Sequence, residues 1–265
     1  MKVYPSENIR NVAIAGHQGA GKTTLIETML HLAGVTQRQG SVNDGTTVSD
    51  FDEDERDRQL SISNALIPFE WEDYKINIID TPGYSDFQGE VQQAVRVADA
   101  VLVIVDAVSG PEVGTELAFQ FAQDFNQPVI VAINRVDREN ADFYTALEQL
   151  RERFTGHKFV PVTIPIGEQD SFKGVMGAVT KKAYYGTDGK REDPPADLVD
   201  DLEAAHLEMV EAAAEADDDY IEKYFETGEL SNDEIRDGMR KAARNADLLT
   251  VPVFATSSEG IGVIT

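Results

Sequence analysis

Short apolar runs alternate with amphipathic stretches along the first 166 residues, and one more apolar run follows residue 247. Buried strands are predicted where Val, Ile and Ala cluster, at 11–16, 61–69, 75–80, 100–107, 128–134, 159–166 and 248–258. Helices are predicted between them, at about 22–32, 114–125 and 141–154, where apolar residues recur with helical spacing. Strands that are apolar on both faces need cover on both faces. The pattern therefore predicts an α/β fold, with a mostly parallel sheet and helices on both of its faces.

The pattern changes between residues 167 and 250. Residues 172–186 predict a small strand pair, and 190–197 form a turn-rich boundary. Helices are then predicted from residue 197 onward, over 217–225 and over about 233–245. Because a strand returns afterwards, we interpret 167–250 as an inserted α+β subdomain, and 1–166 with 251–265 as the main domain.

A long polar stretch, 34–59, lies between the first predicted helix and the second predicted strand. It is rich in acidic residues and shows no strong periodicity. Loops of this length inside compact domains are usually functional lids or disordered segments. We expect one of these two here.

The stretch "GHQGAGKT" fits the pattern G-x-x-x-x-G-K-[ST] and lies between a predicted strand and a predicted helix. Glycines let the backbone wrap around phosphates, whose charge is stabilised by amide N–H groups and the helix dipole. Lys22 is expected to reach the β- and γ-phosphates, and the Thr23 hydroxyl to bind Mg²⁺. The motif predicts a P-loop NTPase. The residues expected to hold the nucleotide phosphates are Gly16, His17, Gln18, Gly19, Ala20, Gly21, Lys22, Thr23 and Thr24.

Two further segments complete the predicted phosphate and metal site. Asp80 ends an apolar strand and begins "DTPG", the position where P-loop enzymes place a carboxylate that holds Mg²⁺, generally through water. Gly83 can bring its N–H close to a γ-phosphate. Ser61, at the end of the long polar stretch, is the candidate hydroxyl for completing the Mg²⁺ shell when the γ-phosphate is present. Thr23, Ser61 and Asp80 are thus the predicted metal ligands.

The segment "INRVD" predicts a site that reads guanine. Asp137 offers a carboxylate to guanine N1–H and the exocyclic amine, a donor pattern that adenine lacks. Asn134 is expected to brace the site, and the aliphatic part of Arg135 to cover the face of the base. Thr256, Ser257 and Ser258 follow the last strand, where a backbone N–H can reach the base. GTP and GDP are therefore favoured over adenine nucleotides.

The charge and composition of the chain argue against several other functions and kinds of site. The formal net charge of −25 repels nucleic acid as a whole, so no direct sequence-specific nucleic acid binding is expected. There is no cysteine, which excludes disulfides and thiolate metal sites. No signal peptide and no apolar run of membrane-spanning length is found, so we expect a cytoplasmic protein without membrane contact.

Taken together, these motifs resemble translational GTPases, most closely elongation factor G. The resemblance covers essentially the whole chain, including "GSVNDGTTVSDFDEDERDRQLSI" as a first switch and "INIIDTPGYSDF" as a second. The segment 167–250 resembles the subdomain that interrupts the G domain of this family. The resemblance implies GTP hydrolysis on the ribosome, with GTP or GDP and Mg²⁺ bound. It also implies an N-terminal G-domain fragment of a longer protein, and a ribosomal stalk protein as partner of the acidic insertion; an ordinary solvated surface is the alternative there.

The chain departs from the elongation factor G pattern at several positions. Gly19 stands where the family has Asp, Arg135 where it has Lys, and Tyr84 where it has His; residues 58–62 read "RQLSI" in place of "RGITI". These departures resemble a divergent branch of paralogues whose second switch often reads Pro-Gly-Tyr. They leave open whether the protein translocates tRNA. Gly19 also removes a carboxylate that could help to hold a monovalent ion.

Tyr84 is the departure with the most direct bearing on catalysis, because the family His orients the attacking water. A phenol is longer than imidazole and essentially neutral at pH 7. Two roles stay open for it: action through a second water, or packing alone. We expect Lys22 and Gly83 to act in catalysis, slow turnover without ribosomes, and a His17 side chain that points to solvent. The alternatives are a GTP-dependent binding switch with negligible turnover, and a ribosome-protection or release-type GTPase.

Overall fold

The computed structural model describes residues 2–263, so the last two residues of the predicted main domain lie outside it. The chain forms two compact units, each described here by itself. Unit 1 runs to Val105 and adds Pro111–Gln127 and Ser258–Gly260. Unit 2 comprises Asp106–Gly110, Pro128–Ser257 and the residues from Ile261 on.

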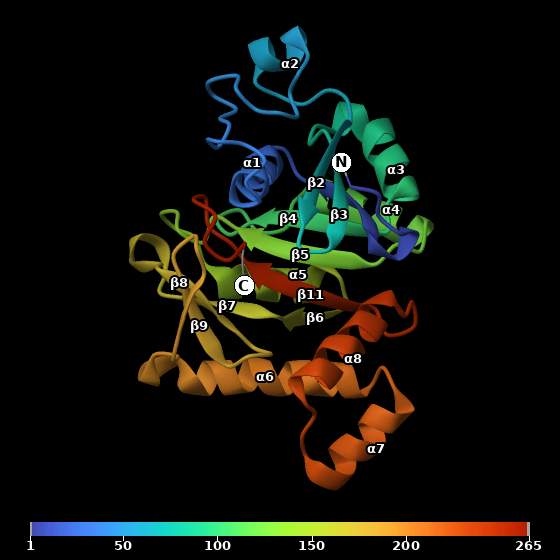
Figure 1. Cartoon of the computed structure of the whole chain (residues 1–265), viewed down its shortest axis with the longest axis vertical. Helices are drawn as coiled ribbons and strands as arrows, with labels where there is room; N and C mark the ends of the chain where they lie inside the picture. Colours follow the sequence, from blue (N-terminus) through green and yellow to red (C-terminus); the bar gives the residue numbers. More distant parts are fainter. Residues whose placement is uncertain (1, 264–265) are drawn as a thin grey trace. The chain divides into compact units, whose positions relative to one another are not determined.

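Unit 1 is built on four strands in the order β2-β3-β1-β4. Strand β1 is parallel to β3 and β4, and β2 is antiparallel to β3. Helix α1 packs on β1 and β3, while α3 and α4 pack on each other and on β1. Figure 1 draws α1 and α3 on opposite sides of β2 and β3. The elements are β1 (Ile9–Gly16), α1 (Lys22–Leu32), α2 (Glu53–Arg58), β2 (Ala65–Trp71), β3 (Tyr74–Asp80), α3 (Gln88–Val97), β4 (Ala100–Asp106) and α4 (Val113–Asp124).

Unit 2 holds three parallel strands, in the order β5-β11-β6, and a separate antiparallel sheet in the order β10-β9-β8-β7. Helix α6 packs against α8 and β6, and α8 packs on β11 (Figure 1). The elements are β5 (Val129–Asn134), α5 (Phe143–Arg153), β6 (Lys158–Pro161), β7 (Thr163–Ile166), β8 (Gly174–Gly177), β9 (Lys182–Tyr185), β10 (Lys190–Glu192), α6 (Val199–Ala214), α7 (Asp218–Thr227), α8 (Asn232–Arg244) and β11 (Thr250–Ala255).

The predicted α/β class, with mostly parallel strands and an additional small antiparallel sheet, is confirmed. The predicted helix 22–32 has the bounds of α1, and the strand pair within 172–186 is β8 with β9. The insertion boundaries at 167 and 250 stay a prediction; the antiparallel sheet itself begins earlier, at β7. No helix among residues 2–263 has both the length and the apolar character that a bilayer crossing requires.

Four details of the structure differ from the prediction or were not predicted. The polar stretch 34–59 holds a short helix, α2, whose N-terminus is capped by Asp52 and Glu55. The run 159–166 is two strands in different sheets: β6 pairs with β11, β7 pairs with β8, and the chain changes sheet at Val162, whose N–H donates to the carbonyl of Val253. Residues 190–192, expected in a turn, form β10. Helix α3 was not predicted, because its buried positions are few: Ala94 and Val95.

Candidate functional site

The P-loop lies where the sequence places it, between the end of β1 at Gly16 and the start of α1 at Lys22. Gly19 and Gly21 have φ angles of 79° and 95°, in the left-handed region that glycine adopts readily. The Lys22 side chain is buried against the loop, and its ammonium group donates to the carbonyl oxygens of Gly16 (3.1 Å) and His17 (3.0 Å). The P-loop backbone therefore holds the positively charged ammonium group of Lys22 in direct contact with its carbonyl oxygens.

The "DTPG" turn after β3 lies directly on the P-loop. The Thr81 hydroxyl donates to the carbonyl of Ile14 in β1, at 2.7 Å. A Cβ atom added at Gly83 would collide with the Lys22 ammonium and would lie 2.7 Å from the Cα of Gln18. Only glycine fits at position 83 without a shift of its neighbours, whereas the predicted approach of its N–H to a γ-phosphate stays a prediction.

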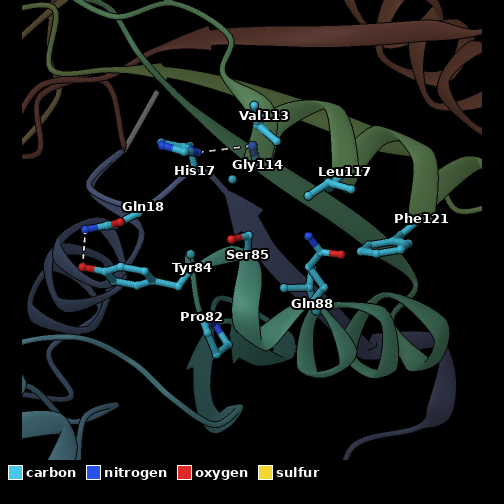
Figure 2. Close-up of a pocket in the computed structure, with 13 residues that line it drawn as sticks. His17, Gln18, Pro82, Tyr84, Ser85, Gln88, Val113, Gly114, Leu117 and Phe121 are labelled. Atoms are coloured by element: carbon cyan, nitrogen blue, oxygen red, sulfur yellow. Dashed lines mark hydrogen bonds between the residues drawn. The ribbon is translucent and has the colours of Figure 1, made fainter.

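Tyr84 turns toward the P-loop. Its hydroxyl oxygen accepts a hydrogen bond from the side-chain amide of Gln18, drawn as a dashed line in Figure 2. The ring is half-buried. Two roles were left open for Tyr84: action through a second water, or packing alone. The hydrogen bond to Gln18 shows that Tyr84 does more than pack, because it also makes a specific polar contact with a P-loop side chain. The sequence gives no sign of this contact, because the two residues are 66 positions apart.

The prediction that His17 points to solvent is wrong. Its ring nitrogen Nδ1 accepts from the backbone N–H of Gly114 at the start of α4 (3.3 Å), as Figure 2 shows. Its Nε2 lies 3.5 Å from the Glu112 carboxylate. A side chain that pointed into solvent would make neither contact; here the histidine links the P-loop to α4.

A cavity of about 280 Å³ opens beside these contacts within unit 1. His17 and Gln18 of the P-loop, Tyr84 of the second switch segment, Gln88 at the start of α3 and Phe121 of α4 lie along its wall (Figure 2). Most of its lining is apolar side chain and backbone. The P-loop, the "DTPG" turn and α4 therefore meet around one small space.

Asp80 and Thr23, two of the three predicted metal ligands, are in direct contact. Asp80 is 1% exposed, and its Oδ2 accepts from the Thr23 hydroxyl at 2.9 Å. Its second oxygen, Oδ1, is buried and has no hydrogen-bond partner among the described residues. Burial raises the pKa of Asp80 to about 6, opposed in part by the positive charge of Lys22 and the Thr23 hydroxyl. An unpartnered carboxylate oxygen beside a hydroxyl is a set of hard oxygen donors that fits Mg²⁺.

Ser61, the third predicted metal ligand, is engaged elsewhere. Its hydroxyl donates to Asp50 Oδ1 at 2.8 Å. The other oxygen of Asp50 accepts from the Thr47 hydroxyl at 3.1 Å, and both Asp50 and Thr47 are buried. Within residues 2–263 the structure brings Thr23 and Asp80 together by a hydrogen bond, but joins Ser61 to Asp50. No group of three or more His, Asp or Glu residues suited to a metal occurs in that part of the chain.

Glu27, which was not predicted from the sequence, anchors the polar stretch 34–59. Glu27 lies on α1, fully buried, and its carboxylate accepts from the backbone N–H of Val48 (2.6 Å) and of Gly40 (3.2 Å). Burial raises its pKa, and the two backbone donors act in the opposite direction. An acidic residue inside the apolar stretch "LIETML" was the available signal.

The predicted guanine-reading residues lie in unit 2, except Ser258, which belongs to unit 1. Asn134 ends β5, and its side-chain oxygen accepts from the Thr256 hydroxyl at 3.1 Å. The backbone N–H of Val136 donates to the Thr256 carbonyl at 3.3 Å. The structure thus brings "NRVD" and "TSS" together, although Asn134 and Thr256 are 122 residues apart. Asp137 itself is partly exposed, next to Val136.

Arg135 and Ser257 are held by specific contacts of their own. Arg135 has a φ of 64°, and its guanidinium donates to Asp106 Oδ2 at 2.7 Å, with both side chains largely buried. The Ser257 hydroxyl accepts from the N–H of Ile261 at 2.9 Å, and so closes the turn that contains Ser258. The loops flanking Asp137 are therefore ordered by side-chain hydrogen bonds.

Comparison with known proteins gives two findings. The model of the elongation factor Tu GTP-binding domain matches residues 7–263. The crystal structure of a protein from Thermus thermophilus is similar, with a TM-score of 0.89 and 32% sequence identity. The similarity covers 97% of this chain and 38% of that protein. The chain thus spans well under half the length of that relative.

Proposed function

Since this chain belongs to the family of elongation factor Tu GTP-binding domains, we propose that it binds GTP together with Mg²⁺ and hydrolyses it to GDP and phosphate. The observation that carries the proposal is the arrangement around Asp80. A buried carboxylate with one unpartnered oxygen lies beside the Thr23 hydroxyl; burial raises the pKa of this carboxyl, and the positive charge of Lys22 opposes the rise in part. These groups fit a phosphate-bound divalent ion.

Each residue has a defined part in this proposal. The P-loop amides and Lys22 bind the phosphates and stabilise the negative charge that develops as the γ-phosphoryl group passes to water. Thr23 and Asp80 hold the metal, directly or through water. Mg²⁺, when bound, supplies charge neutralisation at the phosphate oxygens. Gly83 leaves room for the backbone of the second switch to reach the γ-phosphate.

The guanine preference rests on Asp137, braced by Asn134 and Thr256. D137N is expected to weaken GTP binding about 10- to 150-fold, because a hydrogen bond to a charged group contributes roughly 1.5–3 kcal/mol. It is expected to favour xanthosine triphosphate, whose ring offers an acceptor at that position. The measurement is competition against a fluorescent GTP analogue, with E139Q as control at an exposed acid two residues away. Unchanged GTP preference in D137N contradicts the assignment.

The larger role that we propose is that of an elongation factor G-like translational GTPase acting on the ribosome in the cytoplasm. Support comes from the motifs, from the antiparallel sheet and helices α6 to α8 that follow β6, and from the likeness to a much longer protein. A ribosomal stalk protein is the proposed partner of the acidic insertion. GTP turnover with and without ribosomes tests this role. A ribosome-protection or release-type GTPase is an alternative within the same class.

One observation favours a second candidate function, a GTP-dependent binding switch with negligible turnover. The Tyr84 hydroxyl is hydrogen-bonded to Gln18, so the group that replaces the family His already has a partner. Single-turnover hydrolysis of bound GTP separates the two functions. Tight binding without release of phosphate, even with ribosomes present, supports the switch. Release that ribosomes accelerate supports the GTPase.

A further inference from the structure

The carboxylate of Asp106, which no sequence motif indicated, has two specific partners within unit 2. Asp106 ends β4 and is 8% exposed. Its Oδ1 accepts a hydrogen bond from the backbone N–H of Val108 at 2.8 Å, and its Oδ2 accepts from the Arg135 guanidinium at 2.7 Å. Taking two charges out of water is costly, so a buried ion pair adds little net stability by itself. The geometry that the pair fixes is therefore its more informative property.

Arg135 has a backbone conformation that its neighbours hold in place. Its φ of 64° lies in the left-handed region, which is uncommon for residues other than glycine. On one side, the carbonyl of Asn134 accepts from the N–H of Ala107 at 2.9 Å. On the other side, the N–H of Val136 donates to the carbonyl of Thr256 at 3.3 Å. Conformations of this kind cluster at binding sites, where surrounding contacts over-determine them.

Arg135 is thus fixed at both ends, at its backbone and at its guanidinium, and this sets the path of the aliphatic stem between them. A long side chain that is mobile before binding loses affinity when a ligand has to order it. Asp106 removes that freedom before a nucleotide arrives. A guanidinium also presents its donors in a fixed planar arrangement that matches a carboxylate, whereas an ammonium group is a point charge on a flexible stem. The carboxylate at position 106 therefore orients an arginine more sharply than it would orient a lysine.

We propose that Asp106 is a positioning residue for the nucleotide base: it holds Arg135 in the orientation in which this side chain covers one face of guanine. The proposal rests on the proposed binding of guanine nucleotides at Asp137. It adds the loop 106–110 to the base site, beside the loop that follows β5 and the residue Thr256.

The test compares GDP with inorganic pyrophosphate, a ligand that has phosphates but no base. Both affinities are measured with Mg²⁺ by competition against a fluorescent GDP analogue that is calibrated for each variant. D106N is expected to weaken GDP binding roughly 3- to 30-fold, the range that an ordered cation over an aromatic ring contributes, and to change pyrophosphate binding by less than about twofold. R135M, which keeps an apolar stem but not the charge, is expected to weaken GDP binding to a similar extent. D106N added to R135M is expected to weaken it no further.

D142A is the matched control for a loss of stability. The exposed side chain of Asp142 caps α5, where its carboxylate accepts from the backbone N–H and the hydroxyl of Thr145. Its backbone N–H, which the substitution keeps, donates to the carbonyl of Ala107. D142A is expected to lower the urea midpoint and to leave the ratio of the GDP and pyrophosphate affinities unchanged.

Three outcomes in the variants overturn the inference. If D106N weakens GDP and pyrophosphate equally, Asp106 acts on the phosphate site or on the fold as a whole. If D106N lowers the urea midpoint but leaves both affinities unchanged, its pair with Arg135 is structural only. If the losses in D106N and R135M add in the double variant, the two residues act separately.

Failure of the proposed function is recognised separately. Equal binding of GDP and ADP by the unmodified protein, measured first, would overturn the proposed guanine site and this inference with it. If D106N does not fold, the NMR signal of the Arg135 Nε–H in the unmodified protein decides. GDP is expected to shift this signal and pyrophosphate to leave it in place; no response to GDP overturns the inference.

Discussion

The hydrogen bond between Gln18 and Tyr84 gives a prediction that can be followed quantitatively. Y84F removes the phenol oxygen and Q18L removes the amide, while each keeps most of the side chain. A net neutral hydrogen bond contributes about 0.5–1.5 kcal/mol. The hydrogen bond between Gln18 and Tyr84 is exposed to solvent, so we expect a coupling free energy between the two side chains near the lower end, about 0.5–1 kcal/mol. This corresponds to a factor of roughly 2–5 in a rate or equilibrium constant.

The assay is a double-mutant cycle on the single-turnover rate of GTP hydrolysis and on the free energy of unfolding in urea. The four proteins are the unmodified chain, Q18L, Y84F and the double variant. Q88L replaces Q18L in a control cycle, because Gln88 lines the same cavity and the Tyr84 hydroxyl bonds to Gln18 instead. Coupling in the Gln18 cycle alone is expected. Additivity within about 0.3 kcal/mol in both measurements would refute the reasoning.

Two further predictions concern Asp80 and Gly83. In metal-free protein the folded-state pKa of Asp80, about 6, lies above its ordinary value of 3.8, so folding favours the protonated carboxyl. The contribution of Asp80 to the free energy of unfolding should therefore fall by about 3 kcal/mol as pH rises from about 4 to about 6. Urea unfolding in the presence of EDTA should show this decline in the unmodified protein and not in D80N. The same pH profile in both proteins would contradict the prediction. G83A should lower the free energy of unfolding by about 1–3 kcal/mol, because the added Cβ would collide with Lys22 and Gln18. G89A, which meets nothing within 4 Å, is the control and should be neutral or stabilising in the same unfolding assay.

Features that depend on neighbours in sequence were predictable. The P-loop is a continuous motif, and Lys22 begins α1 as expected, because the glycines, the lysine and the apolar face of the helix all follow one another along the chain. The same holds for Asp80 at the end of β3 and Asn134 at the end of β5. Their positions follow from strand ends, which the apolar runs mark.

Features that depend on distant partners were not predictable. The order of the loop around Val48 comes from a carboxylate on α1, at Glu27, and nothing within the loop itself indicates that anchor. The division of 159–166 into two strands depends on β11, which lies far along the chain and pairs with β6, whereas β7 pairs with β8. His17 likewise finds its partners at Glu112 and Gly114, at the start of a helix that the P-loop sequence does not indicate.

The contacts of Lys22 have a consequence for how tightly phosphate can be bound. A free lysine side chain carries about 2 kcal/mol of rotamer entropy, which an incoming ligand normally has to remove. Here the ammonium is already held by two carbonyl oxygens of the P-loop, so folding has removed that freedom in advance. Phosphate then meets a side chain that is already in place, an advantage of up to roughly 30-fold in affinity over a mobile lysine. The rotamer entropy that Lys22 loses on folding lowers the free energy of unfolding of the protein instead.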